Sequence, residues 1–303
     1  MAKKTEFLRT ALRLGFVFVN LVASLVASLV ASQPSRAAEA LDELRIREVV
    51  NSVVIRDSNG AKSHAARVNE VLDRNRVLIT GVRSRAELQA SDGTVTRVGA
   101  NSVFSLGEGK RQLYLEKGTL LFHSPAGKGG GVIRSSGAMA SVLGTSIVVS
   151  ATQDGGFKLL VLEGNAKATL PKGESISLGA GQLTFIMPGN RGNGGFGPLV
   201  NFRLQEQVAG AKLVNAFKAP LASLSKIKSA VEAQEKKIAE GKMEVTPMRV
   251  LGTAGFDPSA LQMIRIENKD PKPFSKARPE SDPIRDRPVE PVYKKWSGEF
   301  LPR

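Results

Sequence analysis

Cysteine is absent from this chain of 303 residues, and histidine occurs only twice, at His64 and His123. The lack of cysteine excludes disulfide bonds, thiolate metal sites and a cysteine nucleophile. Two histidines so far apart in sequence argue against a histidine-rich metal site and against a serine triad, because both need several convergent groups. We therefore expect no metal, no cofactor and no catalytic residue.

Aromatic residues are also few, at 5% of the chain, whereas glycine occurs 30 times. This composition is typical of short strands joined by turns. Between residues 44 and 188 no run of ten residues has helical periodicity, although residues 42–50 are ambiguous. A parallel sheet with helical crossovers is therefore not expected, and the fold class is predicted as mainly β, an antiparallel sandwich or roll of short hairpins.

Charge is dominated by one sign, since 43 basic residues oppose 28 acidic ones and the net charge is +15. Four basic residues open the chain, an apolar stretch runs from Leu14 to about Ala31, and small residues follow it. That layout predicts a secretory signal peptide over residues 1–37. An uncleaved anchor helix is the alternative, because roughly 18 apolar residues can just span a bilayer.

The chain stays basic without those 37 residues. A periplasmic or secreted protein meets lipid headgroups, lipopolysaccharide and wall polymers as its polyanions. The expected partner is therefore an envelope protein or an anionic envelope polymer, with transient contact to a membrane surface compatible with the same charge. Nucleic acid is not expected as a partner.

Glycine turns punctuate a β domain predicted over residues 42–188. In SRAELQASDGTVTRVG, Ala86, Leu88 and Ala90 share one face, and Asp92-Gly93 is expected to supply the two positive-φ positions of a tight hairpin turn.

Two further hairpins follow the same pattern. LYLEKGTLLFH is expected to turn at Lys117-Gly118 and FKLLVLEGNAKATL at Glu163-Gly164. ESISLGAGQLTFIM closes the series of strands. Evenly spaced short strands of this kind pair with their neighbours through tight connections in an antiparallel sheet.

The composition shifts after the β domain, with a Gly-rich linker at 189–199 and a helical segment at 200–242. Two helices separated by Pro220 are predicted there, the second with an apolar stripe that begins at Leu221. Such helices dock on the sheet, on each other or on a partner, and the sheet is favoured because an apolar face must be covered.

The last segment, 243–303, is predicted to be extended and disordered, since seven of the fifteen prolines lie beyond residue 270. Tyr293, Trp296 and Phe300 near its end are either a docking peptide or a clasp onto the parent domain.

The stretch ASVLGTSIVV, residues 140–149, carries a hydroxyl pair, Thr145 and Ser146, after Gly144. It lacks the second glycine of a nucleophile elbow and lies among strands. We therefore interpret the hydroxyls as structural and Gly144 as a bulge or a close backbone approach within a strand. Val142, Ser146 and Val148 are expected to share one face.

Two other features suggest chemistry at first sight. SPAGKGGG, residues 124–131, superficially resembles a phosphate cradle, but Lys128 is not followed by Ser or Thr and no helix follows, so a flexible hairpin loop is expected. Acid/base catalysis needs two carboxylates in one cleft, and spacing alone does not pair any of the candidates. The candidate carboxylates are Glu87, Asp92, Glu116, Asp154 and Glu163.

The ordered motifs also carry a family likeness. VRSRAELQASDGTVTRVGANSVFSL, YLEKGTLLFHSP, VIRSSGAMASVLGTSIVV, FKLLVLEGNAKA and LGAGQ together resemble the FecR domain of bacterial envelope proteins, from about Gly81 to Phe185. The resemblance implies a periplasmic all-β module that relays a signal from an outer-membrane transporter to a cytoplasmic sigma factor through a membrane-spanning helix.

This sequence departs from that arrangement. About thirteen residues precede the apolar segment, too few for a sigma-binding domain, so direct anti-sigma activity is not expected. Asn165 after Glu163-Gly164, and Ile147 where family members often carry an aromatic, also deviate from the family pattern.

Three functions remain open from the sequence. The preferred one is a non-catalytic FecR-like binding or sensing module of the cell envelope. The alternative is a structural scaffold component of an envelope assembly, tied to another chain by its helices and aromatic tail. An envelope hydrolase ranks last, because no nucleophile, base and orienting group can be named together.

Overall fold

The computed structural model describes four stretches of the chain: residues 40–187, 195–246, 248–250 and 264–266. The chain divides into two units, Met1–Ala38 and Glu39–Arg303, and every described residue belongs to the second. The predicted signal peptide, most of the predicted tail and its aromatic cluster lie outside the described residues. Within the described stretches, no helix has the length and apolar character needed to cross a bilayer.

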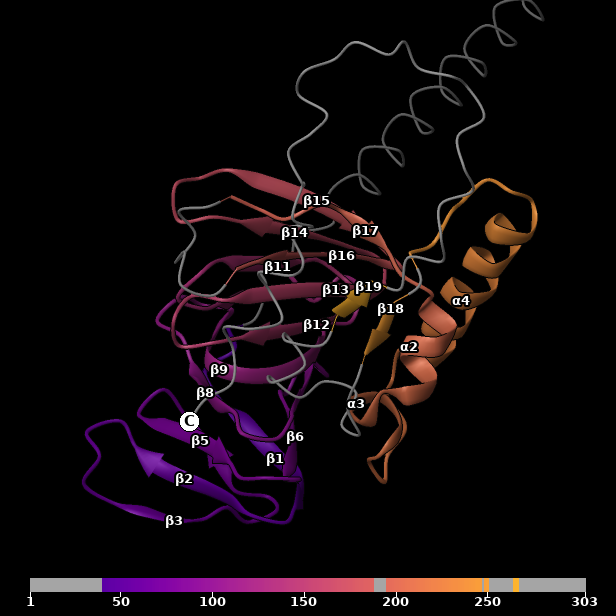
Figure 1. Cartoon of the computed structure of the whole chain (residues 1–303). Helices are drawn as coiled ribbons and strands as arrows, with labels where there is room; N and C mark the ends of the chain where they lie inside the picture. The colour runs from indigo at the N-terminus through magenta and orange to yellow at the C-terminus, as the bar shows by residue number, and fades with distance from the viewer. Residues whose placement is uncertain (1–39, 188–194, 247, 251–263, 267–303) are drawn as a thin grey trace, which may run out of the picture. The chain divides into compact units, whose positions relative to one another are not determined.

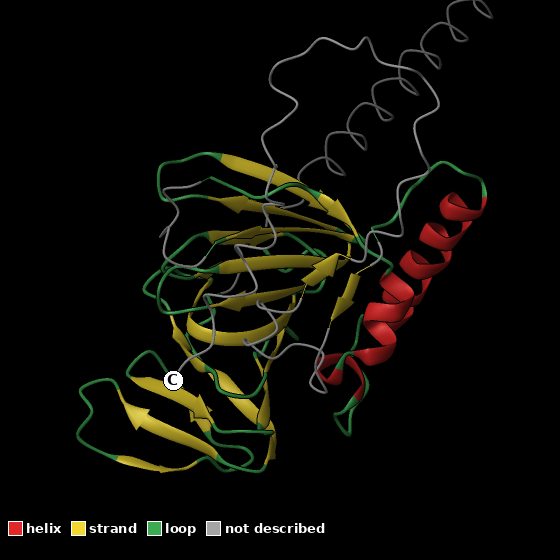
Figure 2. Ribbon diagram, viewed as in Figure 1, coloured by secondary structure: helices red, strands yellow, loops and turns green. Residues whose placement is uncertain are grey.

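Two sheets, A and B, are built from mostly antiparallel strands and share one long strand, β9 (Gln112–His123) (Figures 1 and 2). The first half of β9 belongs to sheet B and the second half to sheet A. The predicted fold class, mainly β and antiparallel, is confirmed.

Sheet A is ordered β4 (Val71–Leu72), β1 (Leu44–Val50), β6 (Arg85–Gln89), β7 (Val95–Val98), β9, β12 (Ser146–Ala151), β13 (Phe157–Glu163), β16 (Gln182–Ile186) and β17 (Val200–Asn201). Sheet B is ordered β3 (Ser63–Ala65), β2 (Val53–Asp57), β5 (Arg76–Thr80), β8 (Val103–Leu106), β9, β10 (Gly131–Arg134), β11 (Met139–Val142), β14 (Asn165–Thr169) and β15 (Ser175–Gly179). The β9–β10 pair is parallel. A separate antiparallel pair joins β18 (Met248–Val250) and β19 (Ile264–Ile266).

The main core lies between the two sheets. Alternate residues of each strand point inward, and in β9 Leu113 and Leu115 do so from sheet B while Leu120 and Phe122 do so from sheet A, all four fully buried. This is the period-two pattern that a strand with one buried face requires.

The hairpin over residues 84–99 is confirmed, because β6 and β7 pair directly with Ala86 opposite Val98. Its turn differs from the prediction in one respect. Gly93 has a φ of +86°, but Asp92 does not take positive φ. Asp92 instead accepts the backbone N–H of Thr94 at 2.8 Å, so its side chain, not its backbone, supports the turn.

The predicted turn at Lys117-Gly118 is wrong, because β9 continues through it as one strand of 12 residues. Gly118 has a φ of +106° and marks the point where β9 leaves sheet B and enters sheet A. A Cβ at Gly118 would lie 2.4 Å from Ser102 Cα, so glycine also permits a close backbone approach there.

The predicted hairpin at Glu163-Gly164 is also wrong. Its two strands, β13 and β14, lie in different sheets and face each other across the core, and Gly164 carries the chain between them with a φ of +77°.

Gly144 makes a similar crossing. ASVLGTSIVV forms two strands, β11 and β12, and Gly144 (φ +66°) carries the chain from sheet B to sheet A. The expected close approach is confirmed, since a Cβ at Gly144 would lie 3.1 Å from Ala126 Cα. The predicted shared face is wrong for Val142, which points into the main core, whereas Ser146 and Val148 both point toward the helices.

In the described part of the chain, three helices and not two follow the sheets: α2 (Leu204–Gly210), α3 (Lys212–Asn215) and α4 (Leu224–Ala239). The predicted first helix is interrupted after Gly210, where Ala211 is extended with a ψ of 104°. Glycine and the extended residue after it end α2 and leave α3 as a separate short turn.

The helical segment docks on sheet A, as predicted from the need to cover the apolar faces of the helices. A second core joins Leu121, Val148 and Leu160 of the sheet to Leu213 and Ile227 of the helices. In Figure 1, α2 and α4 lie side by side, and α4 contacts β13. Sheet A is thus the middle layer, with sheet B on one side and the helices on the other.

Candidate functional site

Ser146, His123 and Glu163 converge on the outer side of sheet A, beneath the helices. His123 Nδ1 lies 2.9 Å from Ser146 Oγ, and Ser146 donates to Glu163 Oε1 at 2.9 Å. Ser223 Oγ, from the residue that precedes α4, lies 2.7 Å from Ser146 Oγ. We call these four residues the serine cluster.

Strand register brings three of them together. His123 stands opposite Ser146 in the β9–β12 pair, and Ser146 stands opposite Glu163 in the β12–β13 pair. Alternation along β12 points Ser146 toward the helices, since Ile147 lies in the main core. The register irregularity between Ser146 and Ile147 skips Leu162 of β13 and brings Glu163 to the same side. Thr145, the other hydroxyl of the pair, donates to the carbonyl of Asn165 at 2.8 Å and has the structural role that the sequence predicted.

The hydrogen-bond pattern of the serine cluster is not that of a triad. In a triad the acid orients the histidine, whose other nitrogen receives the serine proton. Here the Ser146 hydroxyl is placed to donate to Glu163 and to Ser223, and its single proton can serve only one of them at a time. The acid therefore contacts the serine directly. Glu163 Oε1 lies 3.7 Å from His123 Nδ1, which is also the nitrogen that faces Ser146. In a triad the histidine contacts the acid and the serine through two different nitrogens.

Burial closes the serine cluster to a substrate. The four residues are between 0% and 5% exposed, and the hydroxyl of Ser223 lies 2.7 Å from that of Ser146. The arrangement joins three strands of sheet A to the start of α4 by hydrogen bonds in a place that excludes water. Satisfied buried polar networks of this kind fix one packing arrangement.

The remaining predicted carboxylates engage different partners. Glu87 pairs with Arg97 at 2.7 Å, and Asp92 pairs with Arg111 at 2.8 Å. Burial acts to raise the pKa of Asp92, but the hydrogen bonds from Thr94 and the Arg111 guanidinium outweigh it and lower that pKa.

Glu116 accepts a hydrogen bond from Gln153 at 2.7 Å, and Asp154 accepts one from Thr152. Each carboxylate thus supports its own turn or strand pair. Among the described residues, no group of three acidic or histidine side chains forms a metal site.

A second buried polar group was missed by the sequence analysis. Arg97 of β7 is fully buried, and its guanidinium donates to Glu87 and to the carbonyls of Leu213, Val214 and Ala219 at 2.7–2.9 Å. Burial lowers the pKa of Arg97, and Glu87 partly offsets this effect.

The ring of Phe217 adds to the same contact, since the Arg97 guanidinium carbon lies 4.4 Å from the ring centroid. Arg97 therefore binds the end of α3 and the chain after it to sheet A. Arg97 lies on the outward side of sheet A, since its neighbour Val98 points into the main core, and nothing in the sequence indicated which segment would cover it.

The loop of residues 124–131 connects β9 to β10. Lys128 is exposed in it, and a turn forms where the Lys128 N–H donates to the Pro125 carbonyl. It leads into a strand and not into a helix, as predicted. The predicted hairpin is wrong, because β9 and β10 pair in parallel. His64 lies in edge strand β3 and contacts Glu70 at 2.7 Å, far in sequence from His123.

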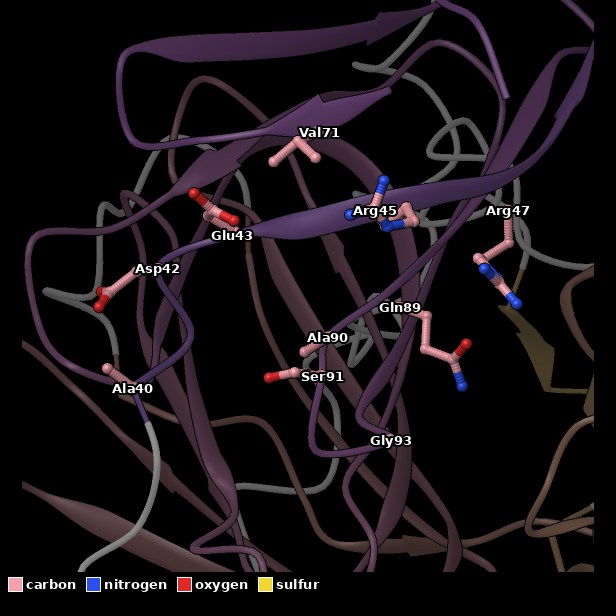
Figure 3. A pocket seen from close by; sticks show the side chains of 10 residues that line it. All are labelled: Ala40, Asp42, Glu43, Arg45, Arg47, Val71, Gln89, Ala90, Ser91 and Gly93. Carbon is pink, nitrogen blue, oxygen red and sulfur yellow. The ribbon is translucent and has the colours of Figure 1, made fainter. Parts of the chain in front are cut away.

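An open pocket of about 550 Å³ lies beside β1 and the β6–β7 turn (Figure 3). Arg45 and Arg47 line it together with Gln89, and Asp42 and Glu43 add opposite charge. Arg45 donates to the Asn69 carbonyl and Asp42 accepts from Arg74, so part of the lining is already paired. The serine cluster does not line this pocket.

Comparison with known proteins agrees with the resemblance seen in the sequence. Residues 76–167, from β5 into β14, match the family model described as FecR protein. No match was found among curated protein sequences.

Two crystal structures from Parabacteroides distasonis, each described as a candidate anti-sigma factor, are similar at 21% identity with TM-scores of 0.36 and 0.39. They align with 41% and 46% of this chain, which covers 59% and 64% of theirs, less than two thirds of either. The residues that match the FecR family model, 76–167, form the strands at the centre of both sheets.

Proposed function

We propose that this chain is a non-catalytic FecR-like binding or sensing module of the cell envelope, located in the periplasm or secreted. The observation that carries the proposal is the FecR match over residues 76–167, in the centre of a two-sheet core. The basic charge and the signal-peptide layout of residues 1–37 support the location. The partner is an envelope protein or an anionic envelope polymer, and nucleic acid is not among the expected partners.

The serine cluster supports a non-catalytic role. Its serine contacts the acid directly and all four residues are buried, an arrangement that differs from the acid–histidine–serine order and the open approach of a hydrolase. A turnover screen of the protein against wall and lipid substrates tests this point. Activity that disappears in Glu163→Gln would refute the non-catalytic role.

The scaffold alternative is less well supported. It relied partly on helices that bind another chain, and the helices cover sheet A of their own chain. The tail remains as its basis. If the alternative holds, deleting residues 271–303 will reduce the size of the complex in sedimentation; an unchanged profile rejects it.

The location is tested by fractionating cells and sequencing the N-terminus of the exported protein. We expect recovery from the periplasm or medium with a new N-terminus near Ala38. A protein that keeps Met1 and stays in the cytoplasm contradicts the proposal.

Binding is tested by capturing partners from envelope extract with the purified protein and with an unrelated protein of equal charge. The proposal requires a defined protein or polymer that is enriched only by this chain. Equal recovery on both would reject a specific binding role.

A further inference from the structure

The outward side of sheet B carries several basic residues and one exposed tyrosine. Arg56 on β2, Arg134 on β10 and Lys167 on β14 all point away from the main core, since their strand neighbours Ile55, Ile133 and Ala168 point into it. The register also places Tyr114 opposite Arg134. We call Arg56, Tyr114, Arg134 and Lys167 the basic face.

The three cations of the basic face are exposed and have no carboxylate partner among the described residues. Arg134 makes only a contact of its Nε with Met139 Sδ, at 3.0 Å. Several other arginines do pair with an acid, as Arg74 does with Asp42 and Arg203 with Glu235. The three cations of the basic face are thus held in no ion pair, and the carboxylate on the same side of β9, Glu116, bonds Gln153 instead.

The spacing of the cations follows from the strand order. Arg134 and Lys167 are two strand steps apart, about 10 Å, and Arg56 lies four steps from Arg134 in the other direction, about 19 Å. Together they span roughly 29 Å across the strands. A row of charges of that length matches an extended polymer better than a single small anion.

Hydroxyl groups lie between the cations. By register, Ser105 stands opposite Tyr114, Ser141 stands opposite Lys167, and Ser177 stands opposite Lys167 on the other side. These groups donate and accept hydrogen bonds, while the exposed ring of Tyr114 offers a flat apolar surface. Charge, hydroxyls and an aromatic ring together fit a polyhydroxylated anionic chain.

A lipid bilayer fits the basic face less well. Membrane-surface elements insert large apolar side chains beside their cations. Among the described residues, the large apolar side chains that are well exposed are Val68, Val82, Tyr114, Leu143 and Leu199. Only Tyr114 belongs to the basic face.

We propose that the basic face binds a linear acidic polysaccharide laid across the strands of sheet B. This inference rests on the proposed binding function and names its surface and its class of ligand. Arg56, Arg134 and Lys167 contact the acidic groups of the polymer, and Tyr114 packs against a sugar ring.

The test measures the affinity of the full chain for polygalacturonate at low salt, with neutral dextran as the uncharged probe. The variant Arg56→Ser/Arg134→Ser/Lys167→Ser is expected to bind polygalacturonate at least tenfold more weakly. The matched control is Lys212→Ser/Lys226→Ser/Lys228→Ser, which removes three exposed, unpaired lysines from the helical segment. It is expected to stay within twofold of the natural protein. Tyr114→Ser, which keeps the charge, is expected to weaken binding at least threefold.

Several outcomes would overturn the inference. Equal losses in the two triple variants mean that only net charge matters, and absence of binding to polygalacturonate by the natural protein rejects the ligand class. Stronger binding to vesicles with one third anionic lipid, or to polyglutamate, with the same dependence on Arg134 and Lys167, assigns the surface to a membrane or to an acidic protein instead. Specific capture of a protein from envelope extract would leave the proposed binding function standing even if the polysaccharide fails.

Discussion

The outer sides of the two sheets use basic residues in opposite ways. On sheet A, Arg97 and Lys158 point outward from the main core and are then buried, Arg97 beneath the helical segment. On sheet B, Arg56, Arg134 and Lys167 occupy equivalent outward positions and remain exposed. A basic residue at an outward strand position is thus buried on sheet A and exposed on sheet B. For Arg97 the helical segment that covers sheet A makes the difference.

The largest expected effect comes from Arg97→Met. Removing the guanidinium leaves Glu87 buried without its ion pair and deprives three carbonyls of their donor. We expect the free energy of unfolding to fall by about 3–5 kcal/mol. Arg134→Met makes the same chemical change on the basic face and should cost less than about 0.5 kcal/mol. Chemical denaturation measures both, and similar losses would contradict the comparison.

Ser146→Ala should have the next largest effect. Glu163, His123 and Ser223 share this one hydroxyl, so its removal leaves buried polar atoms without a partner. A loss of about 2–3 kcal/mol is expected in the same denaturation assay. The control is Ser141→Ala, on the outward side of sheet B, for which the loss should be a few tenths of a kcal/mol. If Ser146→Ala were as mild as its control, the serine cluster would not join α4 to the sheet.

Lys158 provides a pH-dependent test of burial on sheet A. Burial lowers the pKa of Lys158 to about 8 from its usual 10.5. Between these values the unfolded chain binds more protons than the folded one, so this residue makes stability rise as pH increases from 8 to 10.5. Below pH 8 the full free-energy cost of burying the charged Lys158 side chain is present.

Lys158→Met removes that cost and should stabilise the protein at pH 7 by about 1–3 kcal/mol. Thermal melts from pH 7 to 10.5 give the profile, and the gap between variant and natural protein should narrow as the pH rises. A gap that stays constant would mean that titration of Lys158 is not its source.

The smallest effect on stability is expected for the triple variant of the basic face. Exposed cations without ion pairs contribute little to folding, so Arg56→Ser/Arg134→Ser/Lys167→Ser should change the free energy of unfolding by less than about 1 kcal/mol in total. Denaturation curves recorded beside the binding assay check this. A large loss would mean that the basic face contributes to folding, and its binding data would then need variants that remove one charge at a time.

The hairpins show which features of the fold a local sequence pattern can predict. Asp92-Gly93 joins strands that pair directly, and this hairpin was predicted correctly. Gly118 and Gly164 have equally strong turn signals but take the chain from one sheet to the other. A positive φ permits a sharp change of direction in either case, and whether the next strand pairs beside the previous one or faces it depends on partners distant in sequence.

The candidate site, too, depends on contacts between distant segments that a local sequence pattern does not predict. Thr145 and Ser146 were correctly interpreted as structural, because the elbow pattern was incomplete. The meeting of Ser146 with His123, Glu163 and Ser223 was not predicted, since these four residues come from three strands and from the start of a helix nearly 80 positions away. No spacing within one segment indicates such a contact.

The sequence by itself determined the class of fold, the alternation within the individual strands and the likeness to FecR, because alternation and glycine placement are local properties. Only the tertiary structure decided which glycines cross between sheets, where Arg97 is covered and which basic residues stay exposed. Those outcomes depend on long-range pairing and on the docking of the helices over sheet A, which buries one outward face while the cations of the other remain exposed to solvent.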